Sequence, residues 1–102
     1  MNDASAGQRV DVWLWRARLF KTRSLATKTV AAGQVRLTSG GQTRRLTKPS
    51  ALVRGGDTLT LPVNRMIVRL EILALGERRG PASEAQTLYR LLTDPDTQTA
   101  AG

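Results

Sequence analysis

The sequence of 102 residues contains no cysteine and no histidine. Disulfide bonds, thiol nucleophiles, histidine general bases and zinc sites built from cysteine and histidine are therefore excluded. Aromatic residues make up 4% of the chain, and no apolar run approaches the roughly 18 residues that span a membrane. The first residues, MNDASAGQ, hold no apolar segment of the kind found in secretory signals. We therefore expect a cytoplasmic protein.

Acidic side chains are also scarce, because eight Asp and Glu stand against sixteen Lys and Arg, a formal net charge of +8. Residues 1–56 hold eleven bases and two acids, whereas residues 57–102 hold five bases and six acids. No acid occurs between Asp11 and Asp57. This segregation predicts a surface that binds a polyanion, with nucleic acid as the first candidate and an anionic membrane as a distant one.

The few acids show no catalytic or metal-binding pattern. Asp3, Asp94 and Asp96 lie near the ends of the chain, and no two carboxylates have the spacing of metal ligands or of an acid–base couple. The glycine pairs 40–41 and 55–56 are typical of turns and match no phosphate-binding fingerprint. We therefore expect no enzyme, no catalytic residue, no metal, no cofactor and no small-molecule substrate.

Hydrophobic periodicity predicts one α+β domain over residues 9–92, between disordered or frayed tails at 1–8 and 93–102. Two N-terminal helices, from Arg9 to Phe20 and between Thr22 and Gly33, are joined so closely that they must pack as a hairpin. Thr22 is a suitable N-cap and Gly33 a suitable left-handed residue after the last turn. Period-two alternation then predicts a small, mostly antiparallel twisted sheet of about four strands, at 35–38, 42–46, 58–63 and 66–75.

A short C-terminal helix is expected to follow the sheet, because Ser83 and Gln86 have the spacing of a capping box. That helix would bury Leu88 and either Leu91 or Leu92. In the first helix, Trp13 belongs to the core stripe, whereas Trp15 belongs to a weaker apolar patch that should pack under a later segment. Asp11 and Arg18 are expected on the far side of that helix. The second helix should bury five residues, namely Leu25, Ala26, Thr29, Val30 and Ala32.

The start of the second helix carries charges of the unfavourable sign. Lys21 and Arg23 flank a helix end where the dipole disfavours cations. A bound phosphate would explain them, since free backbone N–H groups, the Thr22 and Ser24 hydroxyls and both cations would converge on it. Arg9 and Arg16, seven residues apart on one flank of the first helix, would extend this site. The plainer interpretation is a set of solvated surface bases.

Five more bases complete the candidate RNA-binding residues: Lys28, Arg36, Arg44, Arg45 and Lys48. The expected strands hold no aromatic residue on which bases could stack, which disfavours a single-strand binder. The second helix, SLATKTVAA, offers few side chains that read base edges, which disfavours a DNA helix-turn-helix protein. Structured RNA recognised through its phosphates is the favoured ligand. A regulatory DNA-binding protein is the alternative.

Several short motifs together resemble the RNA-binding domain named after ribosomal protein S4 of the small subunit. They run in order over the motif core at 9–61, and the rest of the domain covers 62–92. The motifs are Arg9-x-Asp11-x-Trp13-Leu14, Lys21-Thr22-Arg23-Ser24-Leu25-Ala26, Gly33-x-Val35, Lys48-Pro49-Ser50 and Gly56-Asp57. Residues 78–85, followed by Leu88-Tyr89, are similar to a stand-alone bacterial branch of this family that responds to heat shock.

The resemblance implies two helices packed on a small antiparallel sheet. It also implies binding to the RNA of free large ribosomal subunits that still carry peptidyl-tRNA, in support of recycling or quality control after stalled translation. Arg9 and Arg23 match RNA-contacting positions, and Lys21, Thr22 and Ser24 share their motif. A third possibility is a detached accessory domain that delivers an RNA-modifying enzyme. We expect a monomer whose partners are ribosomal RNA of the large subunit and tRNA.

Overall fold

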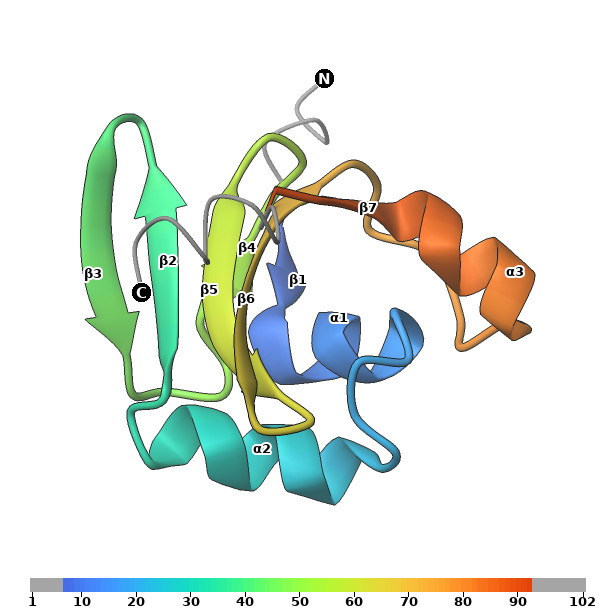
Figure 1. The fold of residues 1–102 in the computed structure, drawn as a ribbon, viewed down its shortest axis with the longest axis horizontal. Coiled ribbons are helices and arrows are strands. Elements are labelled where there is room, and N and C mark those ends of the chain that lie inside the picture. Colours follow the sequence, from blue (N-terminus) through green and yellow to red (C-terminus); the bar gives the residue numbers. More distant parts are fainter. Residues whose placement is uncertain (1–6, 93–102) are drawn as a thin grey trace.

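The computed structural model describes residues 7–92 and has two layers (Figure 1). Helices α1 (Val10–Arg16) and α2 (Arg23–Ala31) form the first layer. The second is an antiparallel sheet of five strands in the order β3-β2-β5-β6-β7. Its strands are β2 (Val35–Ser39), β3 (Gln42–Leu46), β5 (Thr58–Val63), β6 (Met66–Ile72) and β7 (Tyr89–Leu91). The predicted α+β class is confirmed.

A second, two-stranded sheet pairs β1 (Gln8–Arg9) with β4 (Leu52–Val53). Backbone hydrogen bonds from Val10 to Ala51 and from Asp11 to Pro49 join this pair to the start of α1. The sequence predicted neither two-residue strand, and it placed Gln8 in a tail. Residues 1–6 of the expected N-terminal tail (1–8) and all of the expected C-terminal tail (93–102) lie outside the described residues.

Strand alternation places the hydrophobic core on one face of the sheet. Val35 and Leu37 of β2, Leu59 and Leu61 of β5 and Leu70 of β6 are at most 3% exposed. They pack with five buried residues of the helices, Val10, Trp13, Leu14, Ala26 and Val30. Large side chains that meet across both layers hold the helix hairpin in one position on the sheet.

Helix α1 is shorter than the predicted helix, which was expected to reach Phe20. Its last helical residue is Arg16, and Arg18 adopts a left-handed φ of 60° that ends the helix. The apolar stripe nevertheless stays on the core side, because Ala17 is buried and Phe20 packs against the core from the following turn.

Helix α2 begins and ends as the sequence predicted. The Thr22 hydroxyl accepts a hydrogen bond of 3.1 Å from the N–H of Leu25, and Gly33 has a left-handed φ of 77°. Its buried face is narrower than expected. Ala26 and Val30 are fully buried, whereas Leu25 is 47% exposed and Ala32 is also exposed.

The predicted short C-terminal helix is present, but its cap and its end differ from those expected. Helix α3 spans only Ala82–Ala85, its N-cap is Pro81, and no side chain caps it. A single 3-10 turn over Gln86–Leu88 follows, and the chain then extends into β7. Leu88 is buried as expected, but Leu91 is 58% exposed because it lies in an edge strand.

No helix in the described part of the chain is long and apolar enough to cross a membrane.

Candidate nucleic-acid interface

The α1–α2 junction is organised around Asp11, which the sequence placed on the exposed side of the first helix. That expectation is wrong, since Asp11 is 1% exposed. Its carboxylate accepts hydrogen bonds from Arg9 Nε at 3.1 Å and Nη2 at 3.0 Å, and from the Thr27 hydroxyl at 3.0 Å. Arg23 Nε lies 3.9 Å from the same carboxylate. One buried acid therefore forms ion pairs with two guanidinium groups, that of Arg9 at the N-cap of α1 and that of Arg23 at the start of α2.

The electrostatics of this cluster favour the charged form of the Asp11 carboxylate. Burial by itself raises the pKa of Asp11, but hydrogen bonds from Arg9 and Thr27 and the charges of Arg9 and Arg23 outweigh it and lower the pKa. The hydrogen bond and charge of Asp11 in turn raise the pKa of Arg9. The side chains of Arg9 and Arg23 remain 44% and 51% exposed, so each guanidinium can still contact a ligand from the solvent side.

The N-terminal end of α2 lies beside these two arginines. Lys21, Thr22 and Ser24 are all exposed there. Lys48 is exposed in the loop before β4, and this loop contacts the start of α1 through the Pro49 and Ala51 carbonyls. The structure therefore brings together six of the predicted site residues: Arg9, Lys21, Thr22, Arg23, Ser24 and Lys48. We call this group the junction site.

Arg16 has a different position from the one that the sequence predicted. Its Nη1 donates a 2.8 Å hydrogen bond to the Gly76 carbonyl, and its Nε is buried with no partner among the described groups. Trp13 Nε1 donates to Ala74 at 2.8 Å, and Arg18 Nε donates to Gly80 at 2.7 Å. Arg16 thus belongs to a set of side chains that tie α1 to the loop at 74–80.

The same loop covers Trp15. Arg79 lies over the indole at 5.7 Å from the ring centroid, and its Nε donates to the Trp15 carbonyl at 3.1 Å. The weaker apolar patch of α1 therefore packs under a later segment, as expected. Two arginines, Arg18 and Arg79, have structural contacts here that the sequence did not predict.

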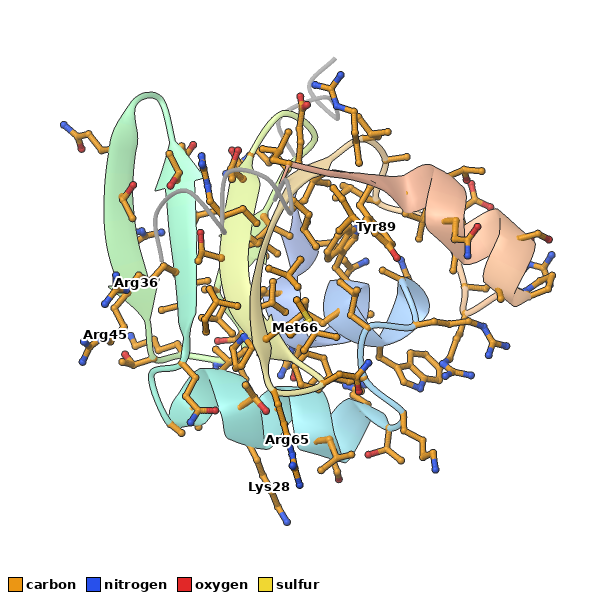
Figure 2. The ribbon with its side chains drawn as sticks, viewed as in Figure 1. Lys28, Arg36, Arg45, Arg65, Met66 and Tyr89 are labelled. Atoms are coloured by element: carbon orange, nitrogen blue, oxygen red, sulfur yellow. The ribbon has the colours of Figure 1, made fainter. Side chains whose placement is uncertain are left out.

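The remaining predicted bases lie on three separate surfaces. Arg36 and Arg45 are directly opposite each other on β2 and β3, and Figure 2 shows them on the same side of the hairpin. Arg44 pairs with Leu37, so it points to the other face of the sheet. Lys28 projects from the exposed side of α2 (Figure 2). Because side chains alternate along a strand, the basic residues of the β2–β3 hairpin lie on both faces of the sheet.

The structure offers no evidence of a metal centre in residues 7–92, which contain no group of three or more acidic side chains that could share a metal ion.

Comparison with known proteins agrees with this geometry. The S4 domain family model matches residues 8–38, which contain α1, α2 and most of β2. The helix hairpin, the antiparallel sheet and the basic junction define the class of the protein, a small RNA-binding protein built on an S4 domain. The resemblance inferred from the sequence motifs is confirmed.

Several known proteins are similar in sequence to most of this chain. Heat shock protein 15 of Escherichia coli K12 is 42% identical over 81 residues, which are 79% of this chain and 57% of that protein. The homologue from Haemophilus influenzae is 37% identical over 82 residues, 80% of this chain and 59% of that protein. This chain therefore spans somewhat more than half the length of these curated relatives.

A solved structure shows the same fold. The trimeric structure of Vibrio cholerae heat shock protein 15 superposes with a TM-score of 0.78 at 36% identity, and covers 94% of this chain and 92% of that one. The chain belongs to the heat shock protein 15 family. The Vibrio protein is trimeric, whereas the sequence of this chain led us to expect a monomer.

Proposed function

We propose that this protein binds free large ribosomal subunits that carry peptidyl-tRNA, and that it assists the recycling or quality control of stalled translation. The observation that carries the proposal is the junction site. Two half-exposed arginines are fixed by one buried carboxylate, beside a helix end whose backbone N–H groups and hydroxyls favour an anion. Membership of the heat shock protein 15 family supports the ribosomal ligand.

The phosphate groups of structured ribosomal RNA and tRNA suit this site. Arginine forks bind phosphate in two-point contacts, and their fixed positions reduce the entropy lost on binding. The described strands contain one aromatic residue, Tyr89, and it packs edge-on against Trp13 with ring centroids 6.4 Å apart. Extensive stacking on the sheet is therefore disfavoured relative to phosphate contacts.

Co-sedimentation with purified ribosomal particles tests the proposal. We expect the protein to sediment with large subunits that carry peptidyl-tRNA and to bind empty subunits and intact ribosomes more weakly. Arg23→Ala should reduce this binding strongly. Arg78→Ala is a matched control, because Arg78 is exposed and pairs with Glu84 outside the basic half of the chain.

Two results would contradict the proposal. Equal binding to duplex DNA and ribosomal RNA at the same salt concentration would favour a DNA-binding protein. Recovery of an RNA-modifying enzyme without large subunits would favour a detached accessory domain.

We infer from the trimeric Vibrio relative that this protein also self-associates. Light scattering coupled to size-exclusion chromatography measures its mass in solution. A monomeric mass at the concentrations used for binding would contradict self-association and support the monomer expected from the sequence.

A further inference from the structure

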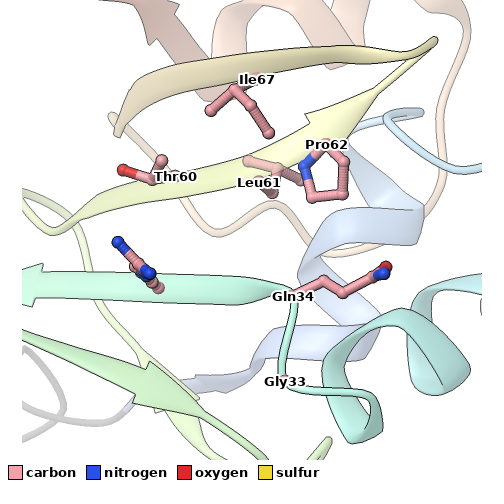
Figure 3. A pocket seen from close by; sticks show the side chains of 7 residues that line it. Gly33, Gln34, Thr60, Leu61, Pro62 and Ile67 are labelled. Atoms are coloured by element: carbon pink, nitrogen blue, oxygen red, sulfur yellow. The ribbon is translucent and has the colours of Figure 1, made fainter.

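A pocket opens between β2 and β5 at the point where their pairing ends. The ladder runs from Thr38–Thr58 to Arg36–Thr60. Continued in the same register, the ladder would place Val35 opposite Leu61 and Gln34 opposite Pro62, but proline has no backbone N–H to donate to a ladder. The strands separate there and leave a cavity of about 430 Å³ (Figure 3). It is lined by Gly33, Gln34, Arg36, Thr60, Leu61, Pro62 and Ile67.

The pocket lies on the sheet face away from the core, and its lining has one apolar and one polar side. Pro62 and Ile67 are cross-strand partners on β5 and β6, so they form one continuous apolar wall. Ile67 is 58% exposed, which is high for a branched aliphatic side chain. The Gln34 amide and the Thr60 hydroxyl supply hydrogen-bonding groups beside this wall.

A pair of like charges lies at this pocket, because Arg36 lines it and Arg45 is the cross-strand neighbour of Arg36. Arg36 and Arg45 are directly opposite each other on β2 and β3, an arrangement that destabilises a sheet. Glu71 is the one acidic residue in the five described strands of this sheet. It lies on β6 and forms an ion pair with Arg90 of β7, at the other side of the sheet from the two arginines. An anion bound between the two guanidinium groups would offset their repulsion.

We propose that this pocket binds one unpaired nucleotide of the RNA. The base lies against the Pro62–Ile67 wall, between the Gln34 amide and the Thr60 hydroxyl, which contact its polar groups. Its phosphate lies between Arg36 and Arg45. A cavity of this volume falls within the usual range for small ligands and holds one nucleotide.

Helix α2 connects the pocket to the junction site. Arg23 begins α2 and Gly33 follows its end, so the two sites are separated by about 15 Å along the helix axis. Lys28 is exposed midway along this helix. One RNA strand can therefore contact the junction site with its phosphates and place an unstacked nucleotide in the pocket. This inference rests on the proposed function, since it assumes RNA bound at the junction.

The test uses two hairpin RNAs with the same stem. One is fully paired, and the other carries a single bulged fluorescent adenine analogue. We expect the wild-type protein to bind the bulged RNA about tenfold more tightly, which corresponds to about 1.4 kcal/mol of binding free energy. Analogue fluorescence should change on binding. Ile67→Ala and Gln34→Ala should remove the preference and the fluorescence change without weakening binding to the paired hairpin.

Met66→Ala is the matched control. Met66 is the neighbour of Ile67 and is 55% exposed, but strand alternation directs it to the opposite face. It should keep the wild-type preference. Thermal melts of each variant confirm folding.

The outcomes separate this inference from the proposed function. Equal binding of both hairpins by the wild-type protein, or an unchanged preference in folded Ile67→Ala and Gln34→Ala, would overturn the pocket and leave RNA binding in place. Failure to bind either hairpin or the ribosomal particles would overturn both.

Discussion

Asp11 is the residue on which the junction site depends. Its single carboxylate accepts hydrogen bonds from Arg9 and Thr27 and forms an ion pair with Arg23. Asp11→Asn keeps the size of the side chain and removes its charge. We expect a loss of about 1–3 kcal/mol in the free energy of unfolding, the range for hydrogen bonds to charged groups. RNA affinity should also fall, although the protein gains positive charge, because both arginines lose their fixed position. Denaturant titration and RNA binding measure the two effects. Tighter RNA binding would show that charge matters more than position.

The lowered pKa of Asp11 predicts how stability depends on pH. A carboxyl whose pKa is lower in the folded state stabilises the protein fully above the ordinary carboxyl pKa of about 4. That contribution is lost as the pH falls further, through the folded-state pKa. In Asp11→Asn this acid-dependent loss should be smaller than in the wild type. Measurement of the free energy of unfolding of both proteins from pH 6 to pH 2 tests this expectation.

Arg23 illustrates how a tertiary contact changes a prediction made from the helix alone. Reversal of its charge would favour the helix dipole, so Arg23→Glu should stabilise an isolated α2. In the folded protein the new carboxylate would instead lie beside buried Asp11. We therefore expect Arg23→Glu to be less stable than the wild type and to bind RNA weakly. Thermal melts decide between the two views, and a melting temperature above that of the wild type would contradict ours.

Trp13 is the largest buried side chain, with no exposed surface and a hydrogen bond from Nε1 to the Ala74 carbonyl. Trp13→Ala should cost about 3–5 kcal/mol of stability, as for other large-to-small aromatic changes. Trp15→Ala should leave RNA affinity unchanged in the folded protein, because Arg79 and the loop at 74–80 cover that indole. Loss of affinity in a folded Trp15 variant would identify the indole as an RNA contact.

At the scale of elements, the helix boundaries that depend on neighbouring residues were predicted correctly from the sequence. Thr22 begins α2 and Gly33 ends it, since a cap hydroxyl and a left-handed glycine act within one helical turn. A short C-terminal helix was predicted, but its missing side-chain cap and the strand β7 that follows it were not. The early end of α1 was missed, because contacts between residues more than sixty positions apart in the sequence fix the turn after Arg16. Asp11 was misplaced for the same reason. Its two-residue spacing from Arg9 was visible in the sequence, but its burial under Thr27 depends on how α2 packs.

Gly33 offers a test of an element boundary. Its φ of 77° is unfavourable for other residues, and an added Cβ would lie 3.1 Å from the Arg45 Cδ. Gly33→Ala should cost about 1–2 kcal/mol of stability. Gly55→Ala is the control, since Gly55 has no left-handed φ and its added Cβ would meet its nearest atom at 3.6 Å. Equal destabilisation of both variants would show that the left-handed φ of Gly33 is not the cause.

At the scale of the whole molecule, ion pairing leaves the N-terminal half strongly basic. Glu71 and Glu84 pair with Arg90 and Arg78 in the second half, whereas Asp11 is the acid available to the described bases of α1 and α2. The charge segregation could be read from the sequence. The division of Arg36, Arg44 and Arg45 between two faces required the strand register.

The basic half predicts a strong dependence of RNA binding on salt. If about six phosphates are neutralised, log K should fall against log salt concentration with a slope of about −4 to −5. Binding measured over a range of potassium chloride concentrations gives this slope. A nearly flat response would contradict a phosphate-dominated interface.

The separation of Arg44 and Arg45 onto opposite faces also bears on the solubility of the protein. Strand β3 is an edge strand, and an unpaired edge is a template on which another chain can add a strand and begin an aggregate. A guanidinium on each side of this edge repels a second copy that approaches in either orientation. The arginines of the hairpin that we propose as RNA contacts would thereby also prevent it from growing into a continuous sheet between molecules.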